Sequence, residues 1–157
     1  MIGRARRLVV SAAGHFVLGV LALALLSCGN AEAPTRAPVF KLSVSGNLTA
    51  DAIEVRGQSN LPDGALIWIY AWHEAENPGW DWEGRVAVDG GFFSVQVPVR
   101  GWGRGLIHAV ASFSVRDQPG AVLEAVGNNG EHLVGGQVLL DEAGVRYLTA
   151  KFDVIRE

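Results

Sequence analysis

Tryptophan is the residue type in this sequence whose placement most suggests contact with a ligand. Two short segments, residues 77–83 and 100–104, combine tryptophan and glycine with Asn, Asp, Glu or Arg. An indole ring stacks on the apolar face of a sugar or a peptide, while neighbouring polar groups bind the edge of the ligand. These segments supply the candidate ligand-binding residues, which are Trp80, Trp82, Trp102, Arg100 and Arg104.

The tryptophans have an alternative role in packing. Trp68 and Trp72 would be core residues, and the loop tryptophans would fold back over one end of the domain, because an indole buries a large area. Solvent exposure separates the two interpretations. Clustered and exposed rings favour a carbohydrate-binding module, whereas buried rings favour a structural role.

Other chemically active side chains form no recognisable catalytic or metal-binding set. The histidines beyond the N-terminal segment lack the spacing of metal ligands and are predicted to lie at the surface; they are His73, His108 and His132. A group of acidic residues lacks the Asp-x-Asp-x-Asp-Gly order of a calcium loop and is predicted to be solvated; it comprises Glu74, Glu76, Asp81 and Glu83. The strand serines lack the Gly-x-Ser-x-Gly context of a nucleophile; they are Ser94, Ser112 and Ser114. The sequence therefore predicts no catalytic residue, no metal, no cofactor and no enzymatic activity.

The elements that position these residues are strands, because apolar and polar residues alternate from residue 39 onward. The apolar run 65–74 predicts a central strand with both faces covered, and residues 118–126 predict a short helix. Alternation also predicts that Phe113 and Phe152 are buried. Turns rich in Gly, Asn, Asp and Pro separate seven candidate strands, at 40–44, 53–55, 65–74, 83–89, 92–98, 106–116 and 148–154. The predicted fold is all-β, an immunoglobulin-like antiparallel β-sandwich of about seven strands with a short helix.

The two tryptophan segments are predicted to open at the same end of this sandwich. The first follows the strand at 65–74, and the second follows the strand at 92–98. A hairpin turn at 89–91 reverses the chain between them, and loops of a sandwich cluster at its two ends.

The N-terminus has the features of an export signal. Residues 1–7 carry three arginines, and residues 8–26 form an apolar run. The following residues, 25–28 (LLSC), resemble the lipobox of bacterial lipoproteins. The resemblance implies cleavage before Cys28 and acylation of that cysteine. Because Gly29 is not Asp, it also implies the outer membrane in an organism that has one.

An uncleaved membrane anchor is the alternative for residues 8–26, because 19 apolar residues just span a bilayer. Both interpretations place the domain outside the cytoplasm, since the arginines stay inside. The predicted organisation is a signal peptide at 1–27, an acylated cysteine with a flexible tether at 28–38, and a folded domain at 39–157.

The turns of the domain resemble those of a recurrent bacterial immunoglobulin-like extracellular domain, here called the NLPDG type. The resemblance is carried by residues 57–64 (GQSNLPDG), 86–92 (VAVDGGF) and 125–133 (AVGNNGEHL), and it covers most of residues 42–140. Pro62 fixes φ in the first turn, and Gly64 is predicted to adopt a positive φ. Turn motifs specify fold rather than activity, so the resemblance implies an exported domain without a known catalytic residue.

Composition limits the partners of the domain. Without Arg4, Arg6 and Arg7, the 13 basic residues fall to 10 against 16 acidic ones, a net charge of −6 for residues 28–157. Such a domain does not neutralise phosphates, which excludes a nucleic-acid binder. Cys28 is the single cysteine of the chain, so burial rather than a disulfide must stabilise the fold.

These observations predict a non-enzymatic cell-envelope lipoprotein that carries a binding or structural module. Its predicted partners are the membrane, through the lipid anchor, and an envelope protein or a wall polysaccharide. The alternative is a carbohydrate-binding module that uses the loop tryptophans.

Overall fold

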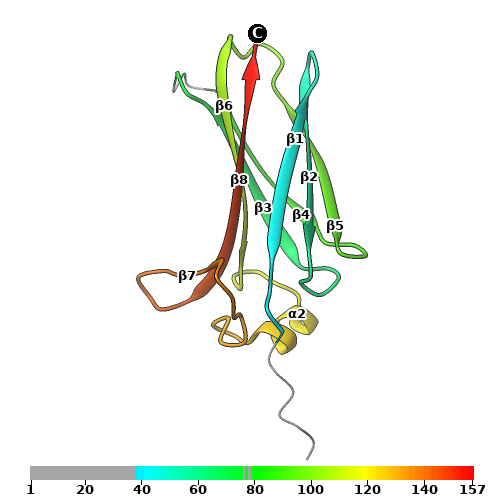
Figure 1. The fold of residues 1–157 in the computed structure, drawn as a ribbon, viewed down its shortest axis with the longest axis vertical. Helices are drawn as coiled ribbons and strands as arrows, with labels where there is room; N and C mark the ends of the chain where they lie inside the picture. Colours follow the sequence, from blue (N-terminus) through cyan, green and yellow to red (C-terminus); the bar gives the residue numbers. More distant parts are fainter. Residues whose placement is uncertain (1–37, 76, 78) are drawn as a thin grey trace, which may run out of the picture. The chain divides into compact units, whose positions relative to one another are not determined.

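Alternating apolar residues build two antiparallel sheets that pack against each other (Figure 1). The structure is a computed structural model, and it describes residues 38–157 apart from Glu76 and Pro78. The smaller sheet has the order β1-β2-β5, with β1 at Leu42–Leu48, β2 at Ala52–Ser59 and β5 at Phe92–Pro98.

The larger sheet has five strands in the order β4-β3-β6-β8-β7. Its strands are β3 at Leu66–His73, β4 at Asp81–Ala87, β6 at Gly105–Ser114, β7 at Val138–Leu140 and β8 at Arg146–Arg156. The short helix α2, at Gly120–Val126, lies beyond one end of the sandwich, near the start of β1 (Figure 1). The predicted immunoglobulin-like β-sandwich is therefore confirmed, with β7 as an additional short strand. The fourth strand pairs with the third here, whereas in constant-type immunoglobulin domains it lies in the opposite sheet.

The core forms where the inward faces of the sheets meet. Ile53 and Val55 of β2 face it from one sheet, and Ile67, Ile69 and Phe113 face it from the other, all fully buried. The prediction for Phe113 is confirmed. The prediction for Phe152 is wrong, because its ring lies over Gly46 of β1, the edge strand of the smaller sheet, and is only half-buried there.

The turn at 60–64 has the predicted geometry. Gly64 has φ 83°, and its N–H donates to the carbonyl of Val88 at 2.8 Å. A residue with a side chain is disfavoured at this φ, so glycine is required where the chain turns into β3.

The prediction that both faces of β3 are covered is wrong. Its inward residues alternate with Trp68, Tyr70 and Trp72, which lie on the outer face of the larger sheet, and Tyr70 is 43% exposed. Trp68 and Trp72 are therefore half-buried surface residues and not core residues. His73, predicted to lie at the surface, shares the inward phase of Ile67 and Ile69 and is only 2% exposed.

The predicted signal peptide, Cys28 and residues 29–37 of the tether lie outside the described residues. Within residues 38–157, apart from the two omitted positions, no helix is long and apolar enough to cross a membrane.

Candidate ligand-binding face

The two tryptophan loops meet at the same end of the sandwich. Trp80 packs edge-on against His73, with ring centroids 4.9 Å apart and planes at 69°. A methyl group at Gly103 would lie 2.6 Å from the Trp80 ring, so the first loop contacts the second directly.

The indoles of these loops pack against protein. Trp102 is 7% exposed and belongs to the core, while Trp82 lies over Gly84 and packs against the core from β4. Arg100 and Arg104 are exposed, and neither forms an ion pair with another described residue. The rings close this end of the core, and ligand binding by the five loop residues stays a prediction.

His73 lies beneath the first loop. Its Nδ1 accepts a hydrogen bond from the N–H of Ala75 at 3.0 Å, so the proton of the neutral ring is on Nε2. Nε2 is buried and has no hydrogen-bond partner among the described residues. The nearby acidic side chains Glu74, Asp81 and Glu83 are exposed, and the described part of the chain contains no cluster of three or more potential metal ligands.

A second set of aromatic residues, on the strand that was predicted to have both faces covered, lies on the outer face of the larger sheet. We call Trp68, Tyr70 and Trp72 the aromatic row. The Tyr70 and Trp72 rings stack at 5.2 Å with planes 20° apart, and Trp72 in turn contacts the His108 ring at 5.0 Å. The aromatic row on β3 is therefore in contact with a further ring, His108, on β6.

Polar groups surround the aromatic row on the neighbouring strands. The guanidinium of Arg85 in β4 lies 4.2 Å from the centre of the Trp68 ring, in a cation–π contact. At the other end of the row, His108 Nδ1 lies 2.8 Å from Asp153 Oδ1 of β8. Glu83 is the β4 residue paired with Tyr70. The face thus combines stacked rings with charged groups of both signs.

A groove of about 420 Å³ opens beside Trp68, at the end of the row nearest α2. Two ion pairs lie in its lining, Arg85 Nη2 to Asp117 Oδ2 at 2.8 Å and Arg116 Nη2 to Asp141 Oδ2 at 3.5 Å. Tyr147 contributes a second aromatic ring to the lining.

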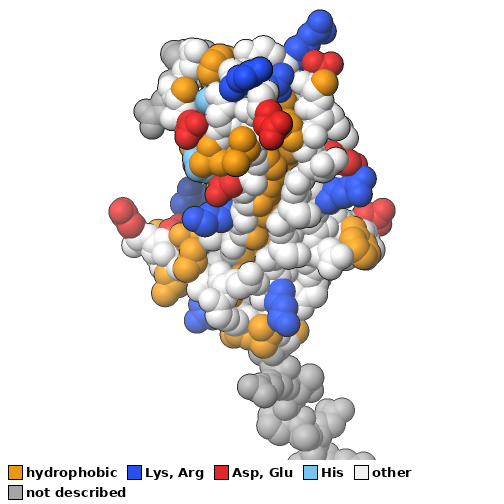
Figure 2. Space-filling view, turned by 45° about the horizontal axis from the view of Figure 1, so that its top comes forward, with side chains coloured by type: hydrophobic (Ala, Val, Ile, Leu, Met, Phe, Trp, Pro, Cys, Tyr) orange, Lys and Arg blue, Asp and Glu red, His pale blue; other side chains and the backbone are white. Residues whose placement is uncertain are grey.

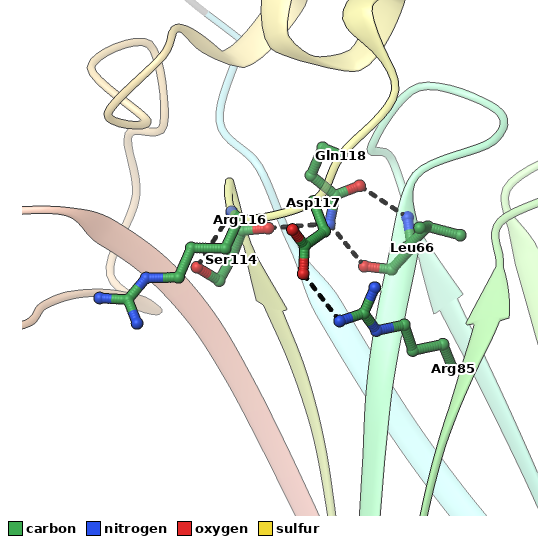
Figure 3. Close-up of polar contacts among 6 residues, drawn as sticks. All are labelled: Leu66, Arg85, Ser114, Arg116, Asp117 and Gln118. Atoms are coloured by element: carbon green, nitrogen blue, oxygen red, sulfur yellow. Dashed lines mark hydrogen bonds and ion pairs between the residues drawn. The ribbon is translucent and has the colours of Figure 1, made fainter.

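The loop that carries Arg116 and Asp117 is held in place by Gln118 (Figure 3). The Gln118 amide donates to the carbonyls of Leu66 and Ser114 at 2.9 and 2.8 Å and accepts from the Leu66 N–H at 2.8 Å. Asp117 has φ 59° and is the one non-glycine residue with positive φ in the described part of the chain. Such a conformation persists where surrounding contacts fix it, and it is found more often at functional sites.

A larger groove, of about 700 Å³, lies on the smaller sheet around Lys41, Asn60 and Phe92. Two of its three amide side chains are already bonded to the backbone. Asn60 accepts from the Lys41 N–H and donates to the Val39 carbonyl, and Gln137 binds the N–H and carbonyl of Leu42. This groove is therefore formed largely by side chains that hold the start of β1, whereas the Trp68 groove adjoins the aromatic row.

No protein-family model matches the chain, and no curated protein matches it either. The geometry of the domain is therefore the basis on which its function can be argued.

Proposed function

We propose that the protein is a non-enzymatic, lipid-anchored module of the cell envelope, and that the outer face of its five-stranded sheet binds an extracytoplasmic ligand. The proposed localisation rests on three features of the sequence, namely the charged N-terminal residues, the apolar run that follows them, and Cys28. The binding surface rests on the described domain.

The aromatic row is the observation that carries the proposal. A sheet face that meets water usually presents polar residues, since only the inner face needs to be apolar. Here three consecutive outward positions of β3 are aromatic, and Tyr70 remains 43% exposed. Contiguous exposed apolar surface that is rimmed by polar residues is typical of an interaction site.

Binding agrees better with this face than catalysis does. His108 hydrogen-bonds to Asp153, but no hydroxyl or thiol among the described residues bonds its other ring nitrogen. Nucleophilic catalysis requires a nucleophile within hydrogen-bond reach of its base. The His108–Asp153 pair instead holds the imidazole against Trp72, with the two ring planes tilted by 32°.

The loop tryptophans contribute less to the proposal, because Trp102 is almost fully buried and Trp80 packs on His73. Rings that are already covered by protein offer little area to a ligand. The carbohydrate-binding interpretation is therefore better placed on the sheet face than on the loops.

Co-sedimentation with isolated envelope fractions tests the proposal. Full-length protein in detergent is mixed with detergent-washed cell-wall sacculi, which hold no membrane into which the lipid anchor could insert, and the pelleted fraction is measured. We expect the unaltered protein to pellet with the sacculi and the Tyr70→Ser/Trp72→Ala variant to stay in solution.

Phe92→Ser is the matched control, because Phe92 is an aromatic residue 58% exposed on the smaller sheet. This variant should pellet like the unaltered protein. Equal sedimentation of all three proteins, or none by any of them, would contradict the proposed surface.

A further inference from the structure

The groove beside Trp68 has a lining whose charges are already paired. Two arginines face two aspartates there, as Arg85 with Asp117 and Arg116 with Asp141. A charged ligand would have to compete with these ion pairs, and it would find no surplus charge of either sign. On the face seen in Figure 2, acidic and basic side chains are likewise interspersed and form no patch of one sign. The chemistry of the groove favours a neutral ligand.

The same lining is rich in hydrogen-bonding capacity. A guanidinium carries five N–H donors and a carboxylate about four acceptor sites, so each ion pair leaves several unused. Ser112 and Ser114 add hydroxyls, and Trp68 and Tyr147 add aromatic surface. Alternating donors and acceptors beside an apolar ring match a sugar, whose hydroxyls lie around the edge of a ring with apolar C–H faces.

An extended peptide fits this position less well. Peptides that add to a sheet bind at an edge, where backbone groups are free. The edge strand β4 contributes only the side chain of Arg85 to the groove, and the other strands that line it are β3, β6 and β8, which are interior strands paired on each side. Their backbone donors and acceptors are therefore used within the sheet.

The groove is also held in shape before any ligand binds. Gln118 fixes the loop through three hydrogen bonds, and Asp117 is kept at positive φ beside Arg85 (Figure 3). A preformed rim reduces the entropy lost on binding. Its volume, about 420 Å³, lies at the lower end of the usual range for small-molecule sites.

We infer that this groove is a subsite for a neutral sugar residue of an extracytoplasmic glycan, whose chain continues along the aromatic row. The inference rests on the proposed function, because it names the ligand of the same sheet face. Trp68 belongs to both surfaces, so a glycan seated in the groove would continue from Trp68 toward Tyr70 and Trp72 along β3.

Calorimetric titration of the full-length protein tests the inference, in a detergent without a sugar headgroup. The probes are neutral oligomers of β-linked N-acetylglucosamine and of β-linked glucose, with oligogalacturonate as a charged saccharide and an oligoproline as a peptide. We expect a neutral oligomer to bind and the charged saccharide and the peptide to fail. Trp68→Ala and Asp117→Asn should each weaken binding about tenfold or more.

Asp117→Asn keeps a residue that tolerates positive φ, so it tests the rim even if Trp68→Ala fails to fold. Arg56→Ala is the control, because Arg56 pairs with Glu54 on the opposite sheet and its loss should leave binding unchanged. Binding of the charged saccharide or the peptide alone, no binding of any probe, or neutral binding insensitive to both variants would overturn the inference. If envelope sedimentation still depends on Tyr70 and Trp72 in that case, the sugar subsite fails while the proposed function stands.

Discussion

The two sheets of this sandwich share one core but differ in what they present to water. On the smaller sheet, the outward positions of β2 are Ala52, Glu54, Arg56 and Gln58, three of which are polar. On the larger sheet, the outward positions of β3 include the three aromatic residues of the row.

This difference shows which features folding requires. Both sheets bury a complete inner face, and the smaller one does so with a largely polar outer face. The aromatic row is therefore not needed to hold the two sheets together, although stacked neighbours add some stability to a sheet. Exposed apolar surface that the core does not need is the feature on which the proposed binding function rests.

Removal of the proposed lipid attachment site is expected to have the largest effect, because the proposed anchoring depends on a single thiol. Cys28→Ala should abolish acylation and processing, and the unmodified precursor should be the only form detected. Mass spectrometry of the N-terminal peptide from membranes measures this. Continued cleavage at the bond before residue 28 in that variant would contradict the lipobox interpretation.

The next largest effect is expected from a substitution on the inner face of the larger sheet, and it is a loss of stability. Phe113 is fully buried, so Phe113→Ala should lower the free energy of unfolding by about 3–5 kcal/mol. Chemical denaturation followed by circular dichroism measures the change. An unaltered midpoint of unfolding would show that the larger sheet does not depend on its inner face.

The outer face should contribute much less to stability. Trp72→Ala removes stacking with Tyr70 and His108, which is worth about 1 kcal/mol. The same denaturation experiment should place this variant well above Phe113→Ala in stability while its envelope binding is lost. A cost as large as that of Phe113→Ala would mean that the row is structural.

The smallest effect on stability is expected from a substitution of Glu131, which lies in the segment between α2 and β7. Hydrogen bonds from the backbone N–H groups of Glu131 and Asn129 lower the pKa of the exposed Glu131 carboxyl. A lowered pKa means that the contribution to stability is present at neutral pH and is lost as the pH falls through that pKa. Melting temperatures from pH 7 to pH 3 should show a slight deficit of Glu131→Gln at neutral pH that vanishes in acid. A deficit that is independent of pH would contradict this cause.

The sequence was sufficient to predict the sandwich, because every second residue of most strands is apolar and the turns carry Gly, Asn, Asp or Pro. It was not sufficient for β3, in which both phases are apolar. Trp68 and Tyr70 occupy positions where a surface strand usually carries polar residues, so a surface strand resembled a buried one. The alternation Trp-x-Tyr-x-Trp was the signal that could have identified a face of its own.

The groove depends on contacts between distant segments and could not be predicted. Gln118 is bonded to Leu66, 52 positions away along the chain, and His108 is paired with Asp153, 45 positions away. The short strand β7 was missed for a similar reason, since its three residues form a strand only through pairing with the edge of β8. Local pattern does not specify such pairings.

Oxidative footprinting of the unaltered full-length protein tests most directly whether the outer face of the larger sheet is the binding surface. Hydroxyl radicals are applied to the protein alone and to the protein bound to the envelope fraction, and oxidation of each aromatic residue is measured by mass spectrometry. We expect binding to protect Trp68, Tyr70 and Trp72 while Phe92 on the smaller sheet is oxidised as before. Protection of Phe92 or of the loop residue Trp80, with the aromatic row unchanged, would contradict it.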